Sequence, residues 1–124
     1  MSSFASKPRF TIFHNPNCTK SCAGLGLLTS RLPPASFETV DYTTQPPSCS
    51  TLREIVEYLG ENRKQAIREE AVSESTASGN CDEIVSILSK DVVKTLQRPI
   101  VVDWQNKKAV IGRPMSNVED LISS

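Results

Sequence analysis

The sequence predicts an α/β fold that contains four β-strands. Short runs rich in β-branched and aromatic residues alternate with longer segments in which apolar residues recur at helical spacing. The order is strand, helix, strand, helices, strand, strand, helix, without an internal repeat or a credible linker. The 124 residues match the size of one ordinary domain with a modest core. We therefore expect a single domain over residues 1–124, with a flexible N-terminal segment at about residues 1–8.

The first strand and the first helix are separated by a tight turn. Residues 9–14, RFTIFH, are mostly β-branched and aromatic, which is typical of a strand. Pro16 lies between two asparagines, and this composition favours a turn because proline fixes φ and asparagine tolerates unusual backbone angles. Residues 19–30 then place Leu25 and Leu28 at helical spacing, so we expect the first helix there.

A second strand and a second helix follow. Residues 36–42, SFETVDY, alternate in the manner of a strand. The prolines of residues 43–49 favour an extended loop, because each proline biases its predecessor away from helical angles. Thr51 and Glu54 have the spacing of a capping box, which predicts a helix that ends at Gly60.

A helical insertion is expected before the third strand. Residues 61–70 predict a short polar helix, residues 72–80 a flexible loop with little apolar content, and residues 81–97 a further helix. No family pattern is evident within residues 69–90.

The C-terminal part predicts two strands and a helix. Residues 99–103, PIVVD, form a buried strand opened by proline, and residues 109–112, AVIG, form the fourth strand. Ser116 and Glu119 make a second capping box, which predicts a terminal helix.

Charge and hydropathy argue against two classes of partner. The chain has 14 basic and 14 acidic residues, so a general attraction to nucleic acid or to an anionic membrane is not expected. No apolar run approaches the roughly 20 residues that a bilayer span needs. The start, MSSFASKPRF, lacks the apolar stretch of a secretory signal, so the cytoplasm is the expected location. Its serines and its lack of acidic residues leave a short mitochondrial presequence as the alternative.

The four cysteines, Cys18, Cys22, Cys49 and Cys81, are expected to be reduced thiols, because intracellular proteins rarely keep disulfides. A structural zinc site usually takes two close pairs of ligands, whereas here only Cys18 and Cys22 are close and His14 is the only histidine. We therefore predict neither a metal site nor a bound cofactor. Cys49 and Cys81 are interpreted as ordinary apolar residues.

Cys18 is the candidate nucleophile on physical grounds. A thiol attacks as the thiolate, and an ordinary cysteine is mostly protonated at neutral pH. Cys18 is expected at the N-terminus of the first helix, where unpaired N–H groups and the positive end of the helix dipole favour an anion. Cys22, about one turn further along, lacks those N–H groups and should remain nearer an ordinary thiol. The same N–H groups would also cradle an oxyanion.

The order of elements, with a cysteine at the first strand-to-helix turn and a proline opening the third strand, resembles the thioredoxin fold with its four-stranded mixed sheet. Three motifs narrow this resemblance: TIFHNPNCTKS at residues 11–21, LQRPIVVD at residues 96–103 and AVIGRP at residues 109–114. They are similar to motifs of the arsenate reductases that use glutathione and glutaredoxin. Residues 43–60 also resemble the loop and helix of that family and of its uncharacterised relatives.

The resemblance implies a thiol oxidoreductase in which Cys18 attacks an oxyanion or an oxidised thiol substrate. It also implies that Arg98 and Arg113 hold the anion, since the planar fork of arginine pairs well with tetrahedral oxyanions. Arg68 matches a third family arginine only by its spacing from the preceding helix. The alternative for Arg68 and Arg98 is an ordinary surface charge. Pro99 is expected to follow a cis peptide bond and to lie against the reactive cysteine.

Two further residues of the cysteine loop have open roles. His14 is a candidate for tuning the thiol of Cys18, or its ring hydrogen-bonds to backbone at the strand end. Many relatives carry arginine four positions after the nucleophile, where this chain has Cys22. Cys22 is therefore a candidate resolving thiol, and glutathione, with glutaredoxin as a candidate partner, is the reductant that the resemblance implies. The alternative function is a redox-sensing regulatory protein that uses a Cys18–Cys22 switch without turnover.

Overall fold

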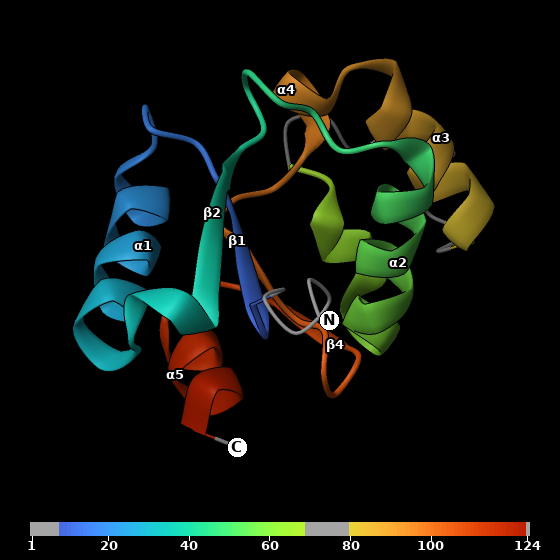
Figure 1. The fold of residues 1–124 in the computed structure, drawn as a ribbon. Coiled ribbons are helices and arrows are strands. Elements are labelled where there is room, and N and C mark those ends of the chain that lie inside the picture. The colour runs from blue at the N-terminus through green and yellow to red at the C-terminus, as the bar shows by residue number, and fades with distance from the viewer. Residues whose placement is uncertain (1–7, 69–79, 124) are drawn as a thin grey trace, which may run out of the picture.

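A four-stranded mixed sheet forms the centre of the molecule (Figure 1). The computed structural model describes residues 8–68 and 80–123. β1 and β2 are parallel, whereas the pairs β1–β3 and β3–β4 are antiparallel, and the spatial order is β2-β1-β3-β4. The four predicted strands are confirmed as β1 (Phe10–His14), β2 (Phe37–Asp41), β3 (Ile100–Asp103) and β4 (Lys108–Ile111).

Seven helical segments connect and flank the strands within the described ranges. They are α1 (Thr19–Arg31), the short 3₁₀ segment η2 (Pro34–Ser36), α2 (Cys49–Leu59), the 3₁₀ segment η3 (Gly60–Ala66), α3 (Cys81–Lys90), α4 (Val92–Thr95) and α5 (Ser116–Ser123). Apart from Pro8, the expected flexible segment at residues 1–8 lies outside the described residues, and so do residues 72–79 of the expected loop.

Helices cover both faces of the sheet (Figure 1). α1 and α5 pack on one face, and α2 and α3 pack on the other. Ile12 and Val101 point toward α1 and α5, where they are fully buried together with Leu28. Ile100 and Val102 point toward α2 and α3 and are equally buried. Because successive side chains of a strand face opposite sides, β3 is apolar on both faces.

α2 begins two residues before the predicted capping box. Its N-cap is Ser48, whose Oγ accepts a hydrogen bond from the N–H of Thr51 at 3.3 Å. Thr51 therefore lies inside the helix, and the prediction that Thr51 and Glu54 open it was wrong. The Ser48 hydroxyl satisfies the free N–H of Thr51, so the helix is capped three residues before the predicted cap.

The helix expected over residues 81–97 is in fact two helices. α3 ends before Asp91, whose φ of −159° and ψ of 83° are not helical. The Asp91 carboxylate accepts a hydrogen bond from the N–H of Lys94 at 3.2 Å and so caps α4. Aspartate competes for backbone N–H groups in this way, which is why it often starts a helix rather than continuing one.

The polar helix expected over residues 61–70 is the 3₁₀ segment η3, which ends at Ala66. Ile67 then forms an antiparallel bridge with Leu96, and this pairing draws both residues into extended conformations. Both of these side chains are buried. The helical turns of η3 and α4 therefore both end at this bridge. It is a long-range contact, which the periodicity of the sequence does not reveal.

Candidate active site

Cys18 is the N-cap residue of α1, as its place in the sequence predicts. Its φ of −109° and ψ of 121° are extended, so Cys18 itself lies outside the helix. The N–H of Cys18 donates to the carbonyl of Asn15 at 3.0 Å, and the N–H of Asn17 donates to the Asn15 side chain at 2.9 Å. This turn holds Cys18, which is 9% exposed, between the end of β1 and the start of α1.

The surroundings of Cys18 favour its thiolate. Burial raises the pKa of the thiol, but the nearby N–H of Ser21, the guanidinium of Arg98 and the N–H of Lys20 oppose it. The positive charge of Arg98 acts in the same direction, and the net result is a pKa below the ordinary cysteine value. The free N–H groups of the first helical turn thus stabilise the anion, as the sequence suggests.

Arg98 and Arg113 lie beside the same sulfur atom. Arg113 Nη2 lies 3.7 Å from Cys18 Sγ, and Arg113 Nε donates to the carbonyl of Arg98 at 2.8 Å. Arg98 Nε is buried and has no hydrogen-bond partner within the described residues. This donor is therefore available to an acceptor that enters the site.

Pro99 opens β3, and the bond between Arg98 and Pro99 is cis, as the resemblance implies. The bond between Arg113 and Pro114 is also cis, which the sequence did not suggest. The Pro99 ring packs between two glycines: a Cβ at Gly24 would lie 3.0 Å from Pro99 Cγ, and one at Gly112 would lie 2.8 Å from it. The absence of side chains at these two positions lets α1 and the chain after β4 approach the proline closely.

Arg68 is held near Arg98 by backbone pairing. The N–H of Arg68 donates to the carbonyl of Thr95 at 2.8 Å, so Arg68 lies opposite the segment that leads to Arg98. The charges of both arginines act on the hydroxyl of Tyr42. Arg68, Arg98 and Arg113 are all half-buried.

Tyr42 and Asn15 line this site, although the sequence did not single them out. The Asn15 side-chain amide donates to the Tyr42 hydroxyl at 3.3 Å. Burial raises the pKa of Tyr42 above its ordinary value, although Asn15 and Arg98 oppose the effect, so the hydroxyl stays neutral. The parallel pairing of β1 and β2 aligns His14 with Asp41, so the residues that follow meet at one edge. The sequence signal that could have identified Tyr42 is its position directly after β2, the strand that pairs with β1.

His14 contacts Ser21, one turn into the helix. Its Nδ1 lies 2.7 Å from Ser21 Oγ, and that oxygen accepts a hydrogen bond from the N–H of Asn15 at 2.8 Å. The Ser21 hydroxyl can therefore donate to Nδ1 when His14 is neutral with its proton on Nε2. Since the N–H of Ser21 lies near the Cys18 thiol, His14 contacts a residue that borders the reactive sulfur.

All four cysteines are free thiols. Cys22 is exposed and lies in the first turn of α1, the helix that Cys18 caps, with its Sγ 3.5 Å from the carbonyl oxygen of Pro16. Cys49 and Cys81 are the first residues of α2 and α3, on the other face of the sheet. Cys81 packs against the core, as expected of an ordinary apolar residue, whereas Cys49 is exposed.

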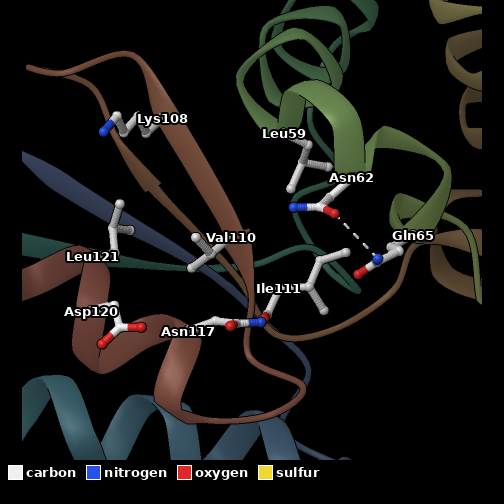
Figure 2. A pocket seen from close by; sticks show the side chains of 9 residues that line it. All are labelled: Leu59, Asn62, Gln65, Lys108, Val110, Ile111, Asn117, Asp120 and Leu121. Carbon is white, nitrogen blue, oxygen red and sulfur yellow. Dashed lines mark hydrogen bonds between the residues drawn. The ribbon is translucent and has the colours of Figure 1, made fainter.

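A separate groove of about 290 Å³ runs along β4 between η3 and α5 (Figure 2). On its η3 side, the amide of Gln65 donates to the side chain of Asn62 at 3.4 Å. On its α5 side, the Asn117 amide donates to the carbonyl of Ile111 at 3.0 Å. The residues that line the groove include neither a cysteine nor any of the three arginines, so the groove is distinct from the thiol site.

A thiol at the N-terminus of the first helix, beside a cis proline that opens a strand of a mixed sheet, places this chain among proteins with a thioredoxin-like fold. The solved structure of an arsenate reductase from Vibrio cholerae is similar over 90% of this chain and 95% of that chain, with a TM-score of 0.70 and 28% sequence identity. The predicted fold class is therefore confirmed.

Sequence comparison places the chain more narrowly. It is 35% identical over 120 residues to a protein named arsenate reductase from Neisseria meningitidis serogroup A, covering 93% of this chain and 99% of that protein. It is also 35% identical over 116 residues to the uncharacterized protein YfgD of Escherichia coli K12, covering 90% and 94% of the two chains. Residues 2–112 match the family described as "Protein of unknown function (DUF1687)". The chain belongs to this family and to the arsenate reductase family of thiol oxidoreductases.

Proposed function

We propose that the protein reduces arsenate, or an oxyanion of the same shape and charge, with Cys18 as the nucleophile. The observation that carries this proposal is the position of the Cys18 sulfur. It lies where the N–H groups of Ser21 and Lys20 meet the guanidinium groups of Arg98 and Arg113. An anion that approaches the thiol would meet donors and positive charge, and the similarity to proteins named arsenate reductase agrees with this chemistry.

The arginines would hold the anion and the thiolate would attack it. Arg98 Nε is a buried donor without a partner in the described residues, and the guanidinium of Arg113 points at the sulfur. Arg68 would add charge from the side of Tyr42. The Cys18 thiolate displaces one oxygen of arsenate, which leaves as water after taking up protons, and a bond forms between sulfur and As(V).

Reduction then needs a second thiol. Its sulfur attacks Cys18 Sγ, and the electron pair of the S–As bond passes to arsenic, which leaves as As(III) oxyanion. The products are arsenite and a disulfide on Cys18. Glutathione, with glutaredoxin as a partner, is the proposed final source of the two electrons. A cytoplasmic location is part of this proposal, because glutathione keeps thiols reduced there.

No helix in the described part of the chain combines the length and the apolar character that crossing a bilayer would require.

A second candidate function is a redox sensor that responds to oxidants without turning over arsenate. The observation that favours it is the exposed thiol of Cys22, one helical turn from Cys18. In that case oxidation of Cys18 would change the conformation of the loop, and the arginines would serve only to keep the thiol ionised.

Arsenite formation separates the two functions. Reduced protein is mixed with arsenate and glutathione, with and without glutaredoxin, and arsenite is measured over time. We expect many turnovers in wild type and in Cys49→Ser, in which an exposed thiol on the opposite face is lost, and a loss of at least about a hundredfold in Cys18→Ser. Wild-type protein that forms no arsenite under any of these conditions would exclude the reductase function and leave the sensor.

A further inference from the structure

We infer that Cys22 is the second thiol of the reaction, which attacks the sulfur of Cys18 and forms an internal disulfide. This inference rests on the proposed function for its substrate, but the pairing of the two thiols can be tested without arsenate. It would give the protein its own reductant for the first turnover and leave glutathione the later task of opening the Cys18–Cys22 bond.

The backbone places the two cysteines within reach of each other. The N–H of Cys22 donates to the carbonyl of Cys18 at 2.9 Å, which is the first hydrogen bond of α1. Residues four apart at this spacing have α-carbons about 6 Å apart, inside the range that disulfides span. The distance between the two α-carbons is therefore suitable for a disulfide bond.

The conformation of Cys18 removes the main geometric obstacle. Two cysteines inside a helix have nearly parallel Cα–Cβ bonds, which would strain a disulfide across one turn. Cys18 is extended rather than helical, with φ −109° and ψ 121°, so its Cα–Cβ bond does not follow the helical direction of Cys22. A modest rotation of the Cys18 side chain can then bring its sulfur toward the helix surface.

The Cys22 side chain also lies on the correct side of the helix. Side chains of a helix lean toward its N-terminus, and Cys22 Sγ lies 3.5 Å from the carbonyl oxygen of Pro16, in the turn that carries Cys18. Its thiol is exposed, so water can take up its proton when it attacks. Cys49 and Cys81 begin helices on the other face of the sheet and are not placed for this role.

The internal route balances without a further reductant. Cys18 has formed its bond to As(V) with release of water. The Cys22 sulfur attacks Cys18 Sγ and loses its proton to solvent, a bond forms between the two sulfur atoms, and the S–As electron pair leaves on arsenic. Two thiols are oxidised to one disulfide, and As(V) is reduced to As(III). Because Cys22 is tethered one turn away, its effective concentration exceeds that of free glutathione.

The first arm of the test measures a single turnover. Fully reduced protein, freed of small thiols, is mixed with arsenate, and both arsenite and intact protein mass are measured. We expect about one arsenite per chain and a protein lighter by two hydrogen atoms, about 2 Da, joined between Cys18 and Cys22. Cys22→Ser should form at least about tenfold less arsenite without glutathione and recover when glutathione is added. Cys49→Ser should behave as wild type.

The second arm replaces arsenate by a hydroperoxide, which oxidises the Cys18 thiolate to a sulfenic acid with reduction of the peroxide to an alcohol or water. Cys22 should then displace water and give the same disulfide, even if arsenate is not the substrate. In Cys22→Ser, the sulfenic acid should persist or oxidise further. A disulfide with peroxide and none with arsenate would support the pairing and overturn the proposed substrate. A wild-type protein that carries a glutathione adduct or a sulfinic acid on Cys18, with Cys22 still free, would overturn the inference.

Discussion

At the scale of single residues, burial and the neighbouring polar groups have opposite effects on the pKa of the Cys18 thiol. Burial alone would favour the neutral thiol, because a charge loses solvation when it leaves water. The nearby N–H groups of Ser21 and Lys20 offset this cost, and the guanidinium of Arg98 adds a polar donor and a positive charge close to the sulfur. Arg98 is therefore the side chain whose removal should change the ionisation of Cys18 most.

The ionisation of Cys18 can be followed by its alkylation rate against pH. Since the pKa of Cys18 is lowered, its thiolate should appear at a lower pH than that of an ordinary cysteine, and Cys18→Ser should lack this fast reaction. Arg98→Ala should move the rise in rate to higher pH, because the thiolate loses the nearby guanidinium and its positive charge. Arg31→Ala, at the exposed end of α1, is the control and should leave the profile unchanged. Identical profiles for wild type and Arg98→Ala would show that Arg98 does not act on the thiol.

The sequence predicts single site residues only where a local pattern marks them. Cys18 is marked by the turn before a helix, and Arg98 and Arg113 each precede a proline within a motif. The contact of Tyr42 with Asn15 is not marked in this way, because it depends on the register between β1 and β2. The contact of His14 with Ser21 likewise depends on how the loop folds over the first turn of α1.

At the scale of elements, the thiol site depends on how tightly α1, β3 and the chain after β4 pack around Pro99. Gly24 and Gly112 lie against its ring from two sides. Gly26, by contrast, has nothing within 4 Å of the position that a Cβ would occupy. Within α1, Gly24 therefore allows close packing against Pro99, whereas Gly26 does not. Gly26 is a control position for substitutions at the glycines that contact Pro99.

Substitution of these glycines should act in opposite directions. Gly112→Ala would place a Cβ 2.8 Å from Pro99 Cγ and 3.3 Å from Val118 Cγ2, so we expect the free energy of unfolding to fall by about 1–3 kcal/mol. Gly26→Ala should raise the free energy of unfolding by about 0.5–1 kcal/mol, because alanine stabilises a helix interior relative to glycine. Urea unfolding measures both. A Gly112→Ala protein as stable as wild type would mean that the packing around Pro99 is looser than the structure indicates.

The turn between β3 and β4 is organised by the fully buried carboxylate of Asp103. It accepts two hydrogen bonds from Arg9, at 3.1 and 2.9 Å, and others from the N–H groups of Gln105 and Asn106. Burial raises the pKa of Asp103, but these donors outweigh burial, so the pKa lies below its ordinary value. The carboxylate thus joins the residue before β1 to the end of β3.

Asp103 should make the stability of the protein depend on pH. A lowered pKa in the folded state stabilises the fold above the unfolded value of about 3.9, and this contribution is lost as pH falls through the folded value. Asp103→Asn should lower the free energy of unfolding at neutral pH by about 1–3 kcal/mol and reduce its acid dependence. Urea unfolding across the acid range measures both, with the exposed Asp82→Asn as control. Equal acid dependence in wild type and Asp103→Asn would contradict this role.

Element types were predictable where an apolar pattern sets them, as in β1, β3, α1 and α5. The ends of helices were less predictable, because the capping residues determine where a helix begins and ends. Ser48 opens α2 before the expected start, and Asp91 divides the segment expected to be one helix. Sequence spacing alone does not rank Ser48 above Thr51 as the cap of α2, and it does not show that Asp91 caps a new helix.

At the scale of the whole molecule, the sheet brings distant parts of the chain into one site. Antiparallel pairing aligns Phe13 of β1 with Ile100 of β3, so Pro99 lies beside the strand end from which the Cys18 loop departs. Arg113 reaches the same place because β4 pairs with β3 and ends there. The thioredoxin-like resemblance implied a four-stranded mixed sheet, whereas the register between its strands could not be derived from periodicity alone.

The central claim is that the Cys18 thiol and the arginines form one oxyanion site. The most direct measurement is the rate of Cys18 alkylation at fixed pH with increasing arsenate, in a Cys22→Ser background that blocks internal disulfide formation. We expect saturable protection, and Arg113→Lys should need about tenfold to a hundredfold more arsenate, because losing the guanidinium fork costs about 1.5–3 kcal/mol. Arg31→Lys, remote and exposed, should need no more than the parent. An alkylation rate that does not respond to arsenate would contradict the claim.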